Sequence, residues 1–178
     1  EDLWVKIRDG IIDKDFLRKH RFYDTFLHFG IDDEQLAQYF EKHFLDEIIN
    51  FNELIPQTIE VLEYLKEKGY QLHVVSNGFH EVTNRKVEKS GLKKYFETVT
   101  SAEDAHAMKP DERIFEYSLN LANAEKSESI FIGDDWVADV KGAQNFGLDI
   151  IFFDALKENK TEEGLKTIQN LEEIKNFL

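Results

Sequence analysis

The sequence predicts an α/β fold in which short strands alternate with helices over residues 56–178. Strand-like runs stand at 71–75, 129–133 and 149–153, and a short strand is expected at about 97–100. Amphipathic helical patterns separate these runs. Strands that alternate with helices form βαβ units with parallel pairing and right-handed crossovers. We therefore expect a parallel sheet with helices packed against it.

The helices of this region are expected at 58–68, 80–90, 111–123 and 136–146, with a final helix near 171–178. A glycine directly follows three of them, at Gly69, Gly91 and Gly147. Glycine readily adopts the left-handed backbone conformation that commonly ends a helix. These glycines therefore mark helix ends.

Residues 1–55 have a helical pattern and form a separate predicted domain. Asp13 and Asp15 stand where a first helix would start, and Gly30 stands where it would end. A second helix is expected to open at 32–34. The aromatic residues of this region fall at helical spacings, so most of them are expected to be core, although some could stack on a nucleobase.

Composition excludes several classes of partner. The 178 residues are 42% hydrophobic and include 15 Phe, which is enough for a packed core. The net charge of −14 argues against nucleic acid or an anionic membrane as partner. The chain has no cysteine and no apolar run long enough to span a membrane. We therefore expect a cytoplasmic protein, because the lack of disulfides fits a reducing compartment.

The first candidate site follows the strand at 71–75, which runs into Ser76, Asn77 and Gly78. A hydroxyl, an amide and a flexible backbone ahead of a helix can direct hydrogen-bond donors at phosphate oxygens. The alternative is an ordinary strand-to-helix turn, where these residue types are also common.

The second candidate is Lys109, which precedes Pro110 and a predicted helix. Proline restricts Lys109 to extended conformations and suits the start of a helix. A lysine at this end of a helix opposes the helix dipole unless an anion lies between them. The alternative is a solvated surface lysine.

The third candidate is a group of carboxylates, Asp134, Asp135 and Asp139, directly after the strand at 129–133. Carboxylates gathered at the end of a buried strand repel one another, and a divalent cation would remove that cost. Mg²⁺ fits because it uses one or two carboxylates together with waters and substrate oxygens. The alternative is that Asp134 or Asp135 caps the next helix, but three aspartates exceed the need of one cap.

Three segments carry a resemblance to a known family: VVSNGF at 74–79, KPDERIF at 109–115 and IGDDWVADVKGA at 132–143. They resemble the second, third and fourth motifs of the haloacid dehalogenase superfamily, in the same order and at fitting separations. The closest resemblance is to the branch with an α-helical cap that includes pyrimidine and other nucleoside 5′-monophosphate phosphatases. The resemblance implies a Rossmann-like three-layer αβα core over 56–178, and that 1–55 is the latter part of the cap.

The resemblance also implies a phosphate-binding role for the first two candidates. Ser76 would hold a phosphoryl oxygen, with help from Asn77 and the backbone of Gly78. Lys109 would neutralise the phosphate and the nucleophile. Ser76, Lys109 and Asp134 are thus the implied catalytic residues.

For the acidic segment the resemblance implies a Mg²⁺ site. Asp134 would bind the metal, and Asp135 and Asp139 would support it directly, through water or through further hydrogen bonds. The implied substrate is a small phosphorylated metabolite such as a nucleoside monophosphate.

The first motif of the family is missing from its usual place. It is an Asp-x-Asp at the end of the opening strand and supplies the nucleophile and the general acid/base. The only such pattern is Asp13-Lys14-Asp15, which we interpret as a helix start, since 11–12 is too short for a buried strand. The nucleophile, the first strand and the front of the cap are therefore expected to lie outside this chain.

This absence predicts a structural defect, because the family places the first strand between those at 71–75 and 129–133. Losing about five buried side chains at ~1.5–3 kcal/mol each would remove as much as a domain's whole stability of ~5–15 kcal/mol. We expect a gap in the sheet, and either an N-terminal fragment or a homodimer partner to fill it. Alone, the chain is expected not to fold stably.

Three functions compete. The first is a Mg²⁺-dependent phosphomonoesterase that works through an aspartyl-phosphate. The second is a 2-haloacid dehalogenase, which has the same fold and needs no metal; the acidic segment favours the phosphatase. The third is a non-catalytic binding or scaffold module, which the missing first motif favours.

Overall fold

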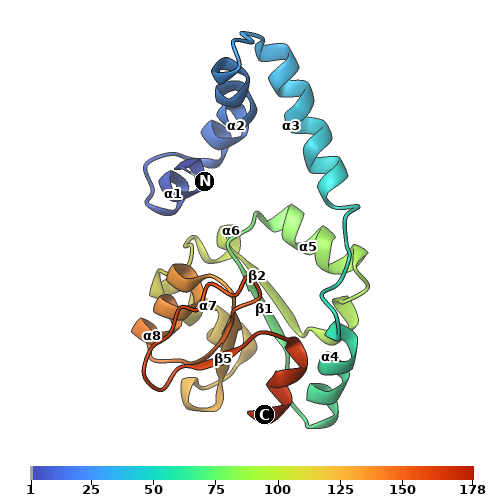
Figure 1. Cartoon of the computed structure of the whole chain (residues 1–178), viewed down its shortest axis with the longest axis vertical. Helices are drawn as coiled ribbons and strands as arrows, with labels where there is room; N and C mark the ends of the chain where they lie inside the picture. Colours follow the sequence, from blue (N-terminus) through green and yellow to red (C-terminus); the bar gives the residue numbers. More distant parts are fainter. Residues whose placement is uncertain (1) are drawn as a thin grey trace. The chain divides into compact units, whose positions relative to one another are not determined.

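The computed structural model describes residues 2–178 (Figure 1). The chain divides into two compact units, the first ending at Phe51 and the second running from Asn52 to Leu178. No helix in the described range is both long and apolar enough to cross a membrane.

The first unit is helical. Its helices are α1 (Asp2–Arg8), α2 (Lys14–His28) and α3 (Glu34–Ile48). Asp13 caps α2, because its Oδ1 accepts the backbone N–H of Phe16 at 2.7 Å. Asp33 caps α3 in the same way through the N–H of Leu36, at 2.9 Å. The prediction that Asp13 starts a helix rather than ending a strand is confirmed.

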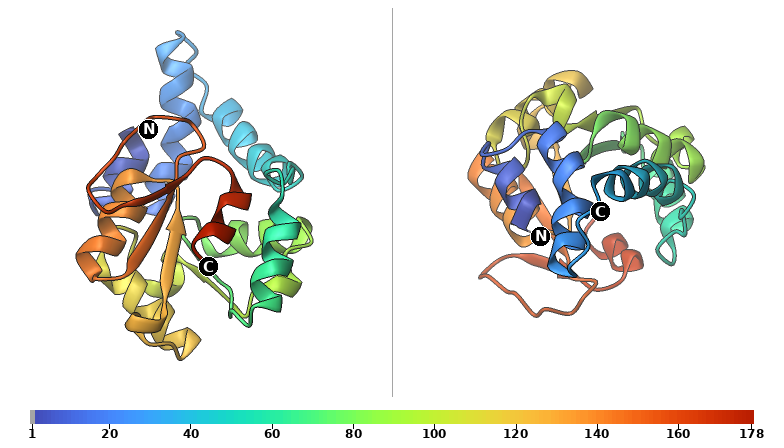
Figure 2. Two further views of the ribbon diagram at one scale, coloured as in Figure 1. Left: turned by 60° about the horizontal axis from the view of Figure 1, so that its bottom comes forward. Right: turned by 90° about the horizontal axis from the view of Figure 1, so that it is seen from above.

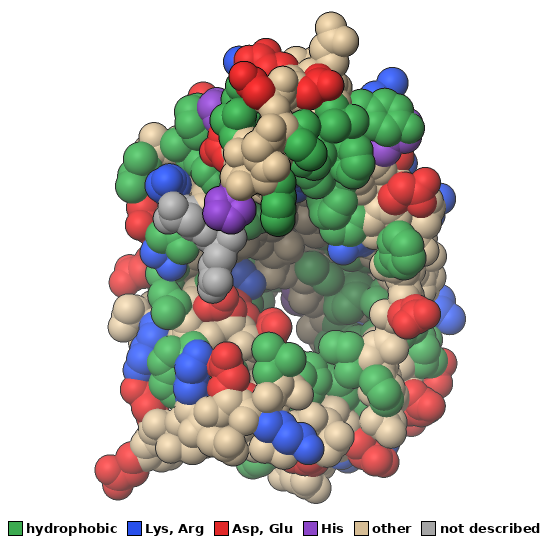
Figure 3. Space-filling view, turned by 45° about the horizontal axis from the view of Figure 1, so that its top comes forward, with side chains coloured by type: hydrophobic (Ala, Val, Ile, Leu, Met, Phe, Trp, Pro, Cys, Tyr) green, Lys and Arg blue, Asp and Glu red, His purple; other side chains and the backbone are tan. Residues whose placement is uncertain are grey.

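Aromatic side chains join α2 to α3. The rings of Phe22 and Phe26 contact those of Phe40 and Phe44, with centroids 5.1–6.0 Å apart between the helices. Phe40 and Phe44 nevertheless remain 44% and 37% exposed. Hydrophobic side chains accordingly gather on the surface of this unit in the space-filling view (Figure 3). The expected aromatic packing is present, but it is only partly covered.

The second unit alternates strands and helices. Its strands are β1 (His73–Ser76), β2 (Thr98–Ser101), β3 (Ile130–Gly133), β4 (Asp149–Phe153) and β5 (Lys166–Ile168). Its α-helices are α4 (Thr58–Glu67), α5 (His80–Lys89), α6 (Ala102–Ala105), α7 (Glu112–Ala122) and α8 (Gly142–Phe146). The shorter helical turns are η1 (Lys93–Tyr95), η2 (Lys126–Glu128), η3 (Trp136–Lys141) and η4 (Leu171–Asn176).

All strand pairs in the described range are parallel. One sheet has the order β1-β2 and the other the order β3-β4-β5. The predicted α/β fold with parallel pairing is confirmed. Strand β5 was not predicted, because it is only three residues long and lacks an apolar run.

Side chains alternate between the two faces of β3 and β4. Phe131, Ile150 and Phe152 lie in one apolar cluster, which includes residues of α7 and α8. Ile130, Ile132, Ile151 and Phe153 lie in the other, with residues of α4 and η4. Helices therefore cover both faces of this sheet, as Figure 2 shows for α4 and α8. The result is the three-layer arrangement implied by the family resemblance.

Strands β1 and β3 each have one unpaired edge within residues 2–178. β1 pairs with β2, β3 pairs with β4, and no ladder joins β1 to β3. All four residues of β1 and of β3 are only half-buried, whereas four of the five residues of β4 are buried. The predicted interruption between these strands is confirmed.

Two predicted helices differ in kind from expectation. The segment 136–146 begins as the π-helix η3 and continues as α8, ending at Gly147 with φ +82°. The end of the chain forms the 3₁₀-helix η4 rather than an α-helix. Apolar spacing indicates a helix but does not distinguish these hydrogen-bonding patterns, which depend on packing and on capping side chains.

Candidate functional site

The turn after β1 is built around the hydroxyl of Ser76. Its Oγ accepts the backbone N–H of Gly78 at 3.0 Å and the hydroxyl of Thr83, from α5, at 3.4 Å. A hydroxyl oxygen has two acceptor positions and one proton, so these contacts leave the proton for a further acceptor. A Cβ at Gly78 would lie 2.7 Å from Thr83 Oγ1, so only glycine fits this close turn.

Asn77 holds the segment that carries Lys109. The amide nitrogen of Asn77 donates to the carbonyl of Lys109 at 2.9 Å, and its amide oxygen accepts the N–H of Lys109 at 2.7 Å. Two segments separated by 32 residues are thereby fixed side by side. The Asn77 side chain was predicted to help bind phosphate, whereas these bonds direct it to the Lys109 backbone. The Lys109-Pro110 peptide bond is cis.

The ammonium group of Lys109 lies at the meeting point of the two sheets. Lys109 is only 9% exposed. Its Nζ donates to the carbonyl of Val75 in β1 at 3.1 Å and lies 2.6 Å from Asp139 Oδ1 in η3. The ring of Phe131 in β3 lies beneath it, with the centroid 5.3 Å away. The surface alternative for Lys109 is therefore wrong, and one of its three N–H groups remains for another acceptor.

Asp139 is buried and organises the loop after β3. Its Oδ2 accepts the backbone N–H groups of Asp134 and Asp135, both at 3.0 Å. Its Oδ1 makes no directional hydrogen bond, yet it lies close enough to Lys109 for a strong ion pair. A Cβ at Gly133 would lie 2.4 Å from Asp139 Oδ2, so the loop requires glycine there.

The other two aspartates of this loop differ in their hydrogen bonds. Asp135 is the N-cap of η3, because its Oδ1 accepts the N–H groups of Val137 at 2.9 Å and Ala138 at 2.7 Å. Asp134 is exposed at the carboxyl end of β3, and no hydrogen bond from residues 2–178 reaches its carboxylate. The predicted capping alternative thus applies to Asp135. Asp134 is the carboxylate of the loop that is available to a ligand.

The three aspartates do not converge on one point. No group of three carboxylate or imidazole side chains in the described part of the chain could hold a metal ion. The donor chemistry still fits Mg²⁺ in one respect, since this ion needs only one or two carboxylates when waters and phosphate oxygens complete its shell. Asp134 can be that ligand, whereas Asp139 is already committed to Lys109 and the loop amides.

The sequence of the chain matches one known protein family over most of its length. The model of the haloacid dehalogenase-like hydrolases matches residues 14–153, which include the site residues. The chain belongs to this family.

Relatives of this haloacid dehalogenase-like hydrolase include pyrimidine 5′-nucleotidase PynA of Streptococcus pneumoniae. The two are 29% identical over 85% of this chain and 63% of PynA. The chain thus spans less than two thirds of that relative's length.

Solved structures of similar fold include two hydrolases. One is the magnesium-bound HAD-hydrolase YfnB of Bacillus subtilis, with a TM-score of 0.88, 23% identity and coverage of 99% of this chain and 77% of that one. Another is the 2-haloacid dehalogenase of Pseudomonas syringae, with a TM-score of 0.67, 26% identity and coverage of 97% and 78%.

Two contacts at the candidate site could not be predicted from the sequence. Thr83 supports Ser76 from the second turn of α5, and the carbonyl of Val75 binds the Lys109 ammonium. Backbone acceptors and supporting hydroxyls carry no residue pattern of their own. Gly133 could have been singled out, because a glycine directly before an aspartate loop often marks a close backbone approach.

Proposed function

We propose that this chain forms most of the active site of a Mg²⁺-dependent phosphomonoesterase of the nucleotidase type. The observation that carries the proposal is the Lys109 ammonium, buried between the carbonyl of Val75 and the carboxylate of Asp139. A buried lysine with one uncommitted N–H, next to a serine whose proton is also uncommitted, suits a bound dianion. Both lie at carboxyl ends of parallel strands, where α/β proteins bind ligands.

Each residue has a defined part in the proposed reaction. The Ser76 hydroxyl and the Lys109 ammonium donate to oxygens of the phosphoryl group and stabilise its charge during transfer. Asp139 holds Lys109 in place and also orients the amides of Asp134 and Asp135. Asp134 would hold Mg²⁺, which when bound supplies Lewis-acid stabilisation of the phosphoryl oxygens.

The nucleophile is proposed to reach the site on a strand between β1 and β3. Its carboxylate oxygen would form the bond to phosphorus while the ester P–O bond breaks, and a second acid would protonate the leaving alcohol. Water would then hydrolyse the aspartyl-phosphate. The unpaired edges of β1 and β3, four residues each, support a strand at this position.

Phosphate release from nucleoside monophosphates tests the activity. With a complementing strand that supplies the nucleophile, we expect turnover in Mg²⁺, loss of turnover with chelator, and loss in Ser76→Ala, Lys109→Met and Asp134→Asn, each folded as judged by circular dichroism. A complementing segment tests the nucleophile: an apolar strand that ends in Asp-x-Asp should give activity to the chain, and the same segment with Asn-x-Asn should not. Full activity of the chain with the Asn-x-Asn segment would contradict the proposed nucleophile.

The second candidate is a 2-haloacid dehalogenase, favoured by the structural likeness to the Pseudomonas syringae enzyme. Release of chloride from a 2-chloro acid in the presence of chelator, without phosphate release in Mg²⁺, would establish this reading. The available carboxylate of Asp134 argues for the phosphatase. If neither substrate is consumed in either condition, even with the complementing Asp-x-Asp strand present, the chain is a non-catalytic module.

A further inference from the structure

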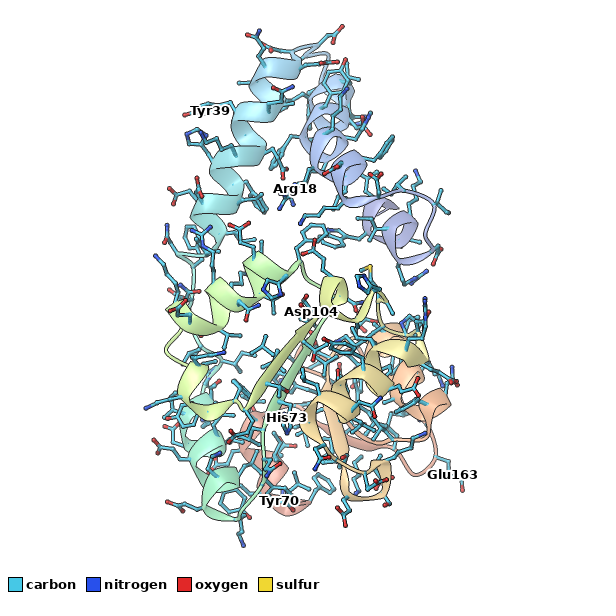
Figure 4. The ribbon with its side chains drawn as sticks, turned by 180° about the vertical axis from the view of Figure 1, so that it is seen from behind. Arg18, Tyr39, Tyr70, His73, Asp104 and Glu163 are labelled. Carbon is cyan, nitrogen blue, oxygen red and sulfur yellow. The ribbon has the colours of Figure 1, made fainter. Side chains whose placement is uncertain are left out.

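His80 is the first residue of α5, directly after the Ser76 turn. Two side chains of α6 bind it. Its backbone N–H donates to Glu103 Oε2 at 2.6 Å, and its imidazole Nδ1 lies 2.7 Å from Asp104 Oδ1. The residues that make these contacts are 23 and 24 positions apart in the sequence. Figure 4 shows Asp104 at the carboxyl end of the β1–β2 pair, the same end that carries Ser76.

The Asp104 carboxylate is itself firmly held. Its Oδ2 accepts the backbone N–H of Ser101 at 2.8 Å and the Ser101 hydroxyl at 2.6 Å. Burial alone would raise the pKa of Asp104, but the hydrogen bonds from Ser101 and His80 outweigh it, and the pKa lies below its usual range. Asp104 is therefore ionised near neutral pH, with one oxygen anchored on β2 and the other on the imidazole.

This anchoring fixes the orientation of the His80 ring. An ionised carboxylate only accepts hydrogen bonds, so the Nδ1 of His80 carries the proton in the pair. No hydrogen bond from residues 2–178 reaches the Nε2 of His80, and the side chain is 58% exposed. The ring thus presents Nε2 away from Asp104 as an accessible polar atom.

The position of His80 indicates which part of a substrate its Nε2 could contact. In the proposed complex the phosphoryl oxygens contact Ser76, which is half-buried, and Lys109, which is buried. His80 lies two residues beyond Gly78, so its Cα is within roughly 7 Å of that turn along the chain. An alcohol attached to the phosphorus would extend from these two groups toward solvent, and His80 is an exposed residue at the same end of the β1–β2 pair.

We propose that His80, oriented by Asp104, binds a hydroxyl group on the alcohol part of the phosphomonoester and thereby selects hydroxyl-bearing substrates. This inference rests on the proposed phosphatase function. The bonds between Asp104 and Ser101 form the capping box at the start of α6, and they also fix the carboxylate that orients the His80 ring. Asp104 is a positioning residue in this proposal, because it acts through His80.

The test compares a nucleoside 5′-monophosphate with phenyl phosphate, which has no hydroxyl on its alcohol part. The chain completed by the Asp-x-Asp strand is assayed in Mg²⁺ for kcat and KM with both substrates. In His80→Asn, which keeps a donor at the Nδ1 position but nothing at Nε2, the ratio of kcat/KM for the nucleotide over phenyl phosphate should fall roughly three- to tenfold, mainly through KM. In His80→Gln, whose amide reaches the Nε2 position, the fall should be smaller.

Two comparisons separate this role from a structural one. Glu81→Gln changes the next residue of α5, which pairs with Arg85, and should leave the substrate ratio unchanged. Asp104→Asn should lower the ratio in the presence of His80 and have no further effect in the His80→Asn background. An independent effect of Asp104→Asn in that background would overturn its positioning role.

The outcomes distinguish failure of this inference from failure of the proposed phosphatase function. If the unaltered protein hydrolyses phenyl phosphate but His80→Asn leaves the substrate ratio unchanged, the inference is wrong and the phosphatase function stands. If the unaltered chain, completed by the Asp-x-Asp strand, hydrolyses neither ester, both are wrong.

Discussion

The Lys109 ammonium lies 2.6 Å from the Asp139 carboxylate, and both side chains are almost fully buried. Lys109 stands ahead of α7, and Asp139 lies in η3 after β3, so the pair joins two segments separated by 30 positions. Because Lys109 also binds the carbonyl of Val75 in β1, this one cation connects both sheets of the second unit.

Lys109→Met should strongly destabilise the chain. The substitution leaves the Asp139 charge buried without its partner, a change that typically costs about 3–5 kcal/mol in the free energy of unfolding. Urea unfolding followed by circular dichroism measures it. Lys175→Met is the control, since Lys175 is half-buried and pairs at 3.6 Å with the exposed Glu172, and its loss should cost less than about 1 kcal/mol. Similar losses in both variants would show that the Lys109 pair is not buried in solution.

Gly133→Ala should displace the Asp139 side chain, because the new Cβ would lie 2.4 Å from its Oδ2. We expect a loss of about 1–3 kcal/mol in unfolding free energy and a loss of phosphatase activity, since Asp139 positions Lys109. Gly69→Ala is a matched control. Its Cβ would meet no atom within 4 Å, but its φ of +89° makes alanine strained. It should lose about 1–2 kcal/mol and keep activity. Retained activity in Gly133→Ala would contradict the role of Asp139.

Asp154→Ala should loosen the loop after β4. The buried Asp154 carboxylate accepts the backbone N–H groups of Glu158 at 2.8 Å and Asn159 at 3.0 Å. Without these bonds, limited trypsin digestion should cut faster after Lys157 or Lys160, as mass spectrometry of the fragments would show. Asp149→Ala, at the exposed start of β4, should leave the cutting rate unchanged. An unchanged rate in Asp154→Ala would mean that other contacts hold the loop.

Stability should depend on pH through His73, which lies at the other end of the β1–β2 pair from Asp104 (Figure 4). Burial lowers the pKa of His73 below its ordinary value of 6.5 in the folded state. Between the folded and unfolded pKa values the unfolded chain binds more protons, so the unfolding free energy rises with pH there and falls as the medium is acidified below about 6.5.

Urea unfolding between pH 5 and 7 should show this dependence, and His73→Gln should reduce it. His28→Gln removes an exposed histidine at the end of α2 and should not change it. An NMR titration of His73 that gave an ordinary or raised pKa would contradict the prediction directly.

Local signals predicted most of the fold. Asp13 and Asp33 cap helices where an aspartate precedes an apolar helical pattern, and the run at 149–153 is a strand over its full predicted length. Both signals act over a few neighbouring residues, so a single sequence contains them. The π-helical start of η3 and strand β5 are set by tertiary packing and were not predicted.

The candidate site was predictable in its residues but not in their contacts. The motifs singled out Lys109 and the three aspartates. They could not show that the Asp139 carboxylate pairs with Lys109 and accepts two backbone N–H groups, whereas the Asp134 carboxylate stays accessible. The His80–Asp104 contact joins residues 24 positions apart and leaves no periodic signal. Such long-range partners are fixed only when β2 and α5 pack together.

The unpaired edges of β1 and β3 have a consequence for handling the chain. An exposed strand edge offers a row of backbone donors and acceptors that can recruit a strand from another molecule. At high concentration, copies of this chain should therefore self-associate through these edges and form β-rich aggregates. A strand that paired with both edges would remove these free donors and acceptors and so protect the chain from aggregation.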